Sequence, residues 1–401
     1  MKKTLLSKAN EIIDQISLPT FSFKEYEYID SQIEETNALN RAWALFAYLL
    51  LPDKRNEEII VKLFKEEIKS RENDVWSGTS ETVKIAAYLV SLYQRMEYIP
   101  LFIQAKNSNF DMYCSFDREF ILSNGLEATL NYININHPDW EEDFQKLFRG
   151  DDNSLKWEES DITKWKERIE NYMNKWFIKP QSSTDLFDFF IEINDTDIAN
   201  EIISQSEKEI KEWNAELLTE YIYFYEQLKL TNKVATAKEV LIQYETDNRN
   251  KVTLFLDLAE YYIDKALYEK AWSYLKEGLS NLKELDNWQQ DTLVSKYIMS
   301  IFSIIIFINN IDHKISLELT LWLKNNFRNL SFNSLELYKR GESVFNLLKD
   351  KSNKKYCKQK IHLLGLQNKQ FKLEAKKEML NTKLKEIKTK IKKVKKKLIH
   401  E

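Results

Sequence analysis

Glycine and proline are scarce throughout this chain. Six of its 401 residues are Gly and five are Pro, whereas average usage would give roughly 28 glycines. β-Hairpins use Gly in their tight turns, and Rossmann and P-loop sites need Gly where the backbone meets phosphate. The shortage favours an all-α protein and argues against the nucleotide-binding loops of many common enzymes.

Apolar residues recur at three- and four-residue spacing in several segments, which predicts amphipathic helices over residues 38–50, 57–68 and 80–95. The longest apolar run covers residues 297–308. Because a bilayer-spanning helix needs roughly 20 such residues, we expect a buried core helix here and no transmembrane segment.

Proline also suggests how the chain is divided. All five prolines lie in the first 180 residues, the last being Pro180. We therefore expect an N-terminal helical region over residues 1–180 and a second helical region over 181–350. The lysine-rich residues 351–401 form a third part.

A 34-residue pattern begins at Val252. It consists of a large–small pair and a Tyr, followed by small and large residues in the second half. These residues are Leu258, Ala259, Tyr262, Ala271, Leu275 and Gly278. The pattern resembles a tetratricopeptide repeat. A weaker copy lies 34 residues upstream, with Ala237 as its small residue, and Ala199 marks a further degenerate unit. The resemblance implies an α-solenoid of antiparallel helix pairs over this half of the chain.

The resemblance also implies a binding groove, because the first helices of such pairs line a concave surface. Five residues would face it: Tyr223, Glu226, Lys229, Glu260 and Asp264. Members of the family that clamp a C-terminal carboxylate use Asn and Lys there, whereas three of these side chains are acidic. We therefore expect a partner with a basic or mixed-charge surface.

Charge is divided unevenly along the chain. Residues 351–401 hold 18 Lys and four acidic residues, a net charge of +14, and the other 350 residues have a net charge of −18. The lysines that make up this predicted basic arm are Lys383, Lys385, Lys388, Lys390, Lys392, Lys393, Lys395, Lys396 and Lys397.

The arm also carries a heptad pattern. Apolar residues recur every seven positions at Leu366, Leu373, Leu380, Ile387 and Val394. Every g position of this heptad pattern is a lysine, so two identical parallel helices would bring together mostly like charges. The arm is therefore expected to meet an acidic partner protein, the acidic body of this chain, a nucleic-acid backbone or an anionic bilayer, unless it is a solvated helix packed on a neighbour.

Ordinary catalytic and metal-binding patterns are missing. Cys114 and Cys357 lie far apart, and no histidine stands at ligand spacing. We expect no cofactor and no metal, and a cytoplasmic, non-enzymatic protein that binds another protein as an adaptor, regulator or immunity-type neutraliser. One alternative is a nucleic-acid-associated factor that binds through the basic arm. The other is an enzyme with an unrecognised helical site.

Overall fold

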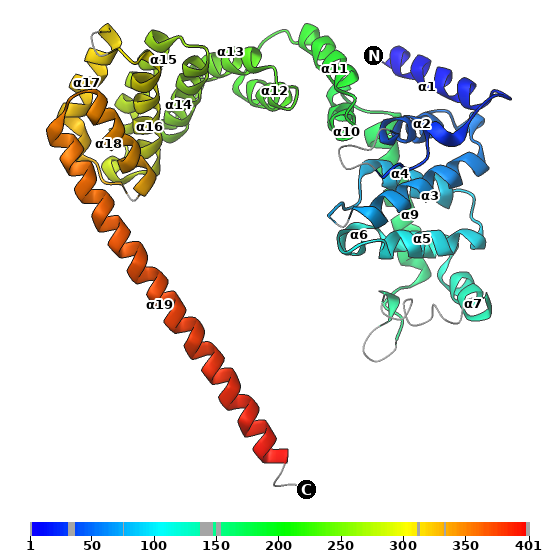
Figure 1. Cartoon of the computed structure of the whole chain (residues 1–401). Coiled ribbons are helices and arrows are strands. Elements are labelled where there is room, and N and C mark those ends of the chain that lie inside the picture. The colour runs from blue at the N-terminus through cyan, green and yellow to red at the C-terminus, as the bar shows by residue number, and fades with distance from the viewer. Residues whose placement is uncertain are drawn as a thin grey trace. The chain divides into compact units, whose positions relative to one another are not determined.

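The computed structural model describes residues 2–30, 37–74, 76–136, 147–149, 154–310, 313–332 and 334–397 (Figure 1). Within them, residues 2, 183, 381 and 384–397 are described by their backbone alone. These ranges contain helices and no β-strand, apart from an isolated bridge between Arg149 and Leu155. The predicted all-α class is thereby confirmed.

The chain divides into two compact units, Met1–Glu212 and Trp213–Glu401, which we call unit 1 and unit 2. The boundary expected at residue 180 lies inside unit 1. Residues 351–401 belong to unit 2, because the first part of this segment packs on the preceding helix.

Unit 1 combines long α-helices with short turns of other helix types. Its α-helices are α1 (Lys2–Ile16), α2 (Ala38–Leu50), α3 (Glu57–Asn73), α4 (Glu81–Ser91), α5 (Ile99–Asn107), α6 (Phe110–Ser115), α7 (Leu126–Asn136), α9 (Glu159–Met173), α10 (Phe187–Glu192) and α11 (Thr196–Glu209). Short 3-10 helices are η1 (Phe23–Glu25), η2 (Pro52–Lys54), η3 (Met96–Tyr98), η4 (Arg118–Leu122) and η7 (Ser183–Leu186), and η6 (Asn174–Ile178) is a π-helical turn.

Helix α2 is the centre of unit 1. Residues 41–49 are all buried, and the helix contacts α1, α3 and α4. Side-chain caps fix where the neighbouring helices begin, since Asn56 accepts a hydrogen bond from the N–H of Ile59 and Ser80 from that of Val83. The predicted helix over 38–50 is confirmed with the same bounds, and the helices expected over 57–68 and 80–95 correspond to α3 and α4.

Unit 2 is a succession of helices joined by short connections. They are α12 (Ala215–Gln227), α13 (Thr231–Leu241), α14 (Asn248–Asp264), α15 (Tyr268–Leu282), α16 (Thr292–Ile308), α17 (Lys314–Asn326), α18 (Leu335–Leu347) and α19 (Lys351–Lys397), with the 3-10 turns η8 (Trp288–Gln290) and η9 (Phe327–Asn329). Helices α12 and α13, α14 and α15, and α18 and α19 pack as neighbours along the chain, while α14 contacts α16 and α16 contacts α18. Their arrangement as a solenoid stays a prediction.

The apolar run at residues 297–308 forms most of α16. Most of its residues lie in the core of unit 2, as expected, whereas Ile306 and Phe307 are exposed. Ala259 and Ala271 are fully buried in the same core. Gly278 of α15 lies against Tyr297 of α16. A Cβ at Gly278 would lie 1.8 Å from the hydroxyl oxygen of Tyr297, so the glycine makes room for a ring from α16.

One backbone turn recurs at four helix ends. Asn194, Lys229, Ala266 and Lys349 adopt positive φ values of 65°, 56°, 57° and 57°. In each case the next residue donates its N–H to the carbonyl five positions earlier, at 2.8 to 2.9 Å. This is the Schellman geometry, in which Gly is the usual left-handed residue. The turn joins α12 to α13, α14 to α15 and α18 to α19. It also joins α10 to α11, the helix that contains Ala199.

Candidate functional site

A surface pocket of about 350 Å³ lies among α12, α13 and α14. It contains three of the five predicted groove residues: Glu226 near the end of α12, Lys229 in the turn that follows, and Asp264 at the end of α14. We call it the α12–α14 pocket. Its remaining lining residues are Tyr225, Thr231, Val234, Ala235, Lys238, Asp257, Leu258 and Tyr261.

The other two predicted residues lie on the same helices outside this lining. Tyr223 is an exposed residue of α12, and its ring packs against that of Phe224 with centroids 5.7 Å apart. Glu260 lies on α14, and its carboxylate is 3.5 Å from the Ser300 hydroxyl of α16. The structure therefore brings three of the five residues into one pocket and places the other two outside its lining.

Three carboxylates follow one face of α14 at helical spacing, and we call Asp257, Glu260 and Asp264 the α14 acidic face. Partial burial raises the pKa of Glu260, and the negative charges of Asp257 and Asp264 raise it further, against the opposing effect of Lys296. A raised carboxyl pKa means that the ionised form is disfavoured here. A cation brought to this face would relieve that cost.

Lys238 of α13 was not predicted as a site residue, although it lies at the centre of the charge network. Its ammonium is 2.7 Å from a carboxylate oxygen of Asp257 and 3.2 Å from one of Glu226. Burial lowers the pKa of Lys238, but the hydrogen bonds to Asp257 and Glu226 outweigh burial and hold it above its usual value. Asp257 could have been identified from the sequence, because it lies three residues before Glu260 on the same helix. Lys238 could not, because its approach to Asp257 depends on how α13 packs against α14.

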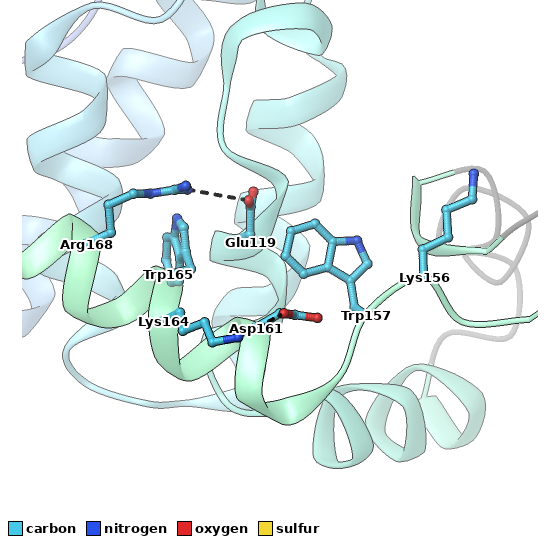
Figure 2. Close-up of a pocket in the computed structure, with 7 residues that line it drawn as sticks. All are labelled: Glu119, Lys156, Trp157, Asp161, Lys164, Trp165 and Arg168. Atoms are coloured by element: carbon cyan, nitrogen blue, oxygen red, sulfur yellow. Dashed lines mark ion pairs between the residues drawn. The ribbon is translucent and has the colours of Figure 1, made fainter.

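A second pocket, of about 370 Å³, lies in unit 1 between η4 and α9 (Figure 2). Figure 2 shows Glu119 between the indoles of Trp157 and Trp165. The guanidinium of Arg168 is 3.7 Å from Glu119, and the ring of Trp165 meets that of Phe120 edge to face at 4.9 Å. Three basic residues of this pocket outnumber its two acidic ones, so its charge does not favour a cation.

The two indoles of this second pocket already have protein neighbours, a cation over the face of Trp157 and a hydrogen-bond acceptor at the edge of Trp165. The guanidinium carbon of Arg118 lies 5.2 Å from the centroid of the Trp157 ring, and the Trp165 indole N–H donates to Asp117 at 3.4 Å. A cation-binding cage would need the free face of such a ring. We therefore take the α12–α14 pocket as the candidate site.

The two cysteines differ in environment. Cys114 is exposed, and His137, its nearest histidine in sequence, lies outside the described residues. Cys357 is buried in unit 2, where burial raises its thiol pKa to about 12 and the charges of Glu342 and Asp350 add to that effect. Such a thiol is unreactive at neutral pH. Searched over the described residues, the structure contains no group of three or more His, Cys, Asp or Glu side chains placed to hold a metal ion.

The predicted basic arm forms the second part of α19. Lys383 is exposed, as are all described side chains from Leu366 onward. The other predicted arm lysines lie beyond the described side chains: Lys385, Lys388, Lys390, Lys392, Lys393, Lys395, Lys396 and Lys397. Across the part of the chain that the structure describes, every helix is too short or too polar to cross a membrane.

Comparison of the chain with protein-family models, with curated proteins and with solved structures finds no match.

Proposed function

We propose that this protein is a non-enzymatic interaction protein and that the α12–α14 pocket, with the α14 acidic face, binds a basic segment of another protein. The observation that carries the proposal is the row of three carboxylates, Asp257, Glu260 and Asp264, along one face of α14. Three like charges on one helix face create a negative potential, which a Lys or Arg side chain would neutralise.

The shape of the site supports a peptide-like ligand. Tyr225, Leu258 and Tyr261 give the pocket apolar surface. Its three carboxylates, Glu226, Asp257 and Asp264, outnumber its two lysines, Lys229 and Lys238. A basic side chain has an apolar stem and a charged end, so both of its parts would find a matching surface here. An adaptor, a regulator and an immunity-type neutraliser would all use such a site.

A charge-reversal experiment tests this proposal. The variant Glu260→Lys/Asp264→Lys would be compared with Glu269→Lys/Glu277→Lys, in which two exposed acids of α15 receive the same change. Binding of the full-length proteins to a panel of fluorescent Lys- and Arg-containing peptides would be followed by anisotropy at low and physiological salt. We expect the α14 variant to lose roughly tenfold or more in affinity and the α15 variant to lose little.

Equal losses in both variants would mean that only net charge matters, and the proposed site would be wrong. Binding that survives both reversals would be equally incompatible with it.

A second candidate function is nucleic-acid binding by α19, which the exposure of its lysines favours. Lys369, Lys372, Lys376, Lys377 and Lys383 are all exposed. Phosphate neutralisation by such a row predicts a gel shift with RNA or DNA that weakens steeply as salt rises. Loss of this shift on deletion of residues 366–401, with peptide binding at the α14 acidic face retained, would separate the two functions.

A further inference from the structure

Helix α19 has one face that is fixed to unit 2. Asn353 and Cys357 are buried, and the Arg328 guanidinium donates to the side-chain oxygen of Asn353 at 2.8 Å. Leu364, seven residues after Cys357, packs partly buried against the same core. A seven-residue step returns to nearly the same side of an α-helix, so these three residues mark the face of α19 that meets unit 2.

A second row of apolar residues runs along α19, with Leu366, Leu373 and Leu380 opposite this face and Leu363 at its edge. Leu363, Leu366, Leu373 and Leu380 are 53%, 47%, 59% and 57% exposed, and we call these four residues the α19 seam. Leu366 comes nine residues after Cys357, which is about two and a half helical turns. The α19 seam is therefore directed away from the core of unit 2 and is open already where α19 still packs on α18.

The spacing of the seam is that of a coiled-coil helix. Leu366, Leu373 and Leu380 recur every seven residues, and Leu363 precedes the first of them by three. The core positions between these leucines are occupied by the polar residues Gln370 and Lys377. Coiled coils accept such residues as determinants of register and partner choice.

The flanking charges indicate which helix would fit. Lys369, Lys376 and Lys383 lie along one edge of the seam and are exposed. A second copy in antiparallel orientation would place these lysines opposite one another. A parallel copy would oppose Lys383 to Lys388 and would gain an attractive pair only where Lys369 meets Glu374. Both self-pairings are thus disfavoured, and acidic residues along the partner's flanks are favoured.

We propose that the α19 seam binds an acidic amphipathic helix of another protein to form a two-stranded coiled coil. This surface is separate from the α12–α14 pocket and prefers the opposite charge. A bilayer would favour a wider apolar face than one leucine row interrupted by Gln370 and Lys377. A nucleic-acid backbone would gain little from the leucines, so the combination of leucine spacing and lysine edge favours a protein helix.

The experiment uses the full chain and two synthetic four-heptad peptides. Both peptides carry Leu at the core positions, and one has Glu and the other Lys along its flanks. Isothermal titration calorimetry at physiological salt should show binding of the Glu peptide at least roughly tenfold tighter than that of the Lys peptide. Equal affinity, or no binding of the Glu peptide, would overturn the proposal.

A matched pair of variants locates the binding face. Leu373→Ser/Leu380→Ser removes two leucines of the seam, whereas Phe371→Ser/Met379→Ser removes two apolar side chains that are 72% and 56% exposed on other faces of α19. The seam variant should weaken binding of the Glu peptide by roughly a hundredfold and the control by less than about threefold. Circular dichroism of each variant would report whether α19 remains helical, and equal losses at equal helicity would contradict the assignment of the face.

Three further measurements address the other occupants of the seam. Sedimentation of the full chain would reveal a dimer that the seam variant abolishes, and hydrogen exchange over residues 363–383 would reveal protection by the chain's own body. Binding of anionic vesicles or RNA that depends on Leu373 and Leu380 would identify a different ligand class. Any of these results, with the Glu peptide unbound, would refute the proposal. Their absence together with selective Glu-peptide binding would support it.

Discussion

Units 1 and 2 place their charged residues differently. Among the described residues of unit 1, five charged side chains are buried: Arg41, Glu66, Glu67, Lys106 and Asp195. Among the described residues of unit 2, the buried polar side chains are Ser300, Ser316 and Asn353, none of which is charged. The charges of unit 2 lie on its surface, on the α14 acidic face and along α19.

The buried charges of unit 1 hold irregular backbone in place. The Arg41 guanidinium donates to Glu67 at 2.7 Å and to the carbonyl of Tyr26 at 3.4 Å. Lys106 donates to the carbonyl of Phe116 at 2.6 Å, at the turn between α6 and η4. Unit 2 instead repeats one turn geometry and relies on apolar packing. The comparison teaches that unit 1 pairs charges inside its core, whereas unit 2 pairs charges such as Lys238 and Asp257 nearer its surface.

The largest effect that would test this contrast is expected from Arg41→Ala. It removes the closer of the two cations that pair with buried Glu67 and leaves only Arg71, at 3.7 Å. Breaking a buried ion pair in this way costs about 3–5 kcal/mol in comparable sites. Chemical denaturation followed by circular dichroism would measure the loss of stability. Arg95→Ala is the control, because Arg95 pairs with Glu57 at an exposed position and should cost no more than about 1 kcal/mol. Similar losses of stability for both variants would show that the buried ion pair of unit 1 contributes no more than an exposed one.

A smaller loss is expected in unit 2 from Gly278→Ala. The new methyl group must displace the Tyr297 ring, whose hydroxyl donates to the carbonyl of Val252 at 2.7 Å. Overpacking and loss of this hydrogen bond together predict a destabilisation of about 3 kcal/mol. Gly365→Ala, where a Cβ meets open space, should instead stabilise α19 by about 0.5–1 kcal/mol. Thermal unfolding of both variants would measure these opposite changes, and a neutral Gly278→Ala would contradict the close packing of α16.

A pH-dependent effect is expected from Asp195 in unit 1. Its carboxylate accepts hydrogen bonds from Lys8 at 2.9 Å and from the Trp43 indole at 2.7 Å. Burial raises the pKa of Asp195, but these bonds outweigh burial and lower the pKa below its usual value. The folded state thus prefers the ionised form, and the resulting stability is present above about pH 4 and lost as the pH falls through the lowered pKa.

Asp195→Asn removes this contribution and should cost about 2 kcal/mol at pH 7. The difference from the unsubstituted protein should shrink steadily below about pH 4. Denaturation curves collected from pH 7 to pH 2 would measure it. A difference that stays constant across this range would show that the charge of Asp195 is not what stabilises the contact with α1.

The smallest effect has the opposite sign and concerns the repeated turn. Ala266 has a φ of 57°, a conformation that costs an L-residue about 1 kcal/mol and that Gly adopts freely. Ala266→Gly should therefore stabilise unit 2 by about 0.5–1 kcal/mol, and Lys349→Gly should act in the same direction. A fall in the unfolding temperature of both variants would contradict the left-handed assignment.

The sequence predicted the helices better than the division of the chain. The apolar spacing of residues 38–50 and 297–308 was sufficient because core-facing residues must recur with the helical period. The division between Glu212 and Trp213 carries neither Pro nor Gly, while Pro180 follows a π-helical turn inside unit 1. The predicted division rested on proline, whereas the division into units 1 and 2 follows the packing of the helices, which composition does not reveal.

The candidate site was predicted only in part for a related reason. Glu226 and Asp264 followed from positions within a repeat, whereas Lys238 reaches Asp257 only because α13 packs against α14. The scarcity of glycine also concealed the repeated turns, since Asn, Lys and Ala occupy positions where Gly is usual. The four turns share one backbone geometry, which their residue types do not reveal.

Helix α19 continues without a break from its attached segment into the seam. The direction in which the seam faces is therefore fixed relative to the core of unit 2. Each residue of an α-helix advances about 1.5 Å and rotates about 100°, so no flexible joint absorbs a change in length between Cys357 and Leu366. Inserting two residues there would rotate the seam by more than half a turn about the helix axis. Inserting seven residues would move it about 10 Å along the axis and leave its direction almost unchanged. We therefore expect binding at the seam to tolerate insertions in this short segment only when they add a whole heptad.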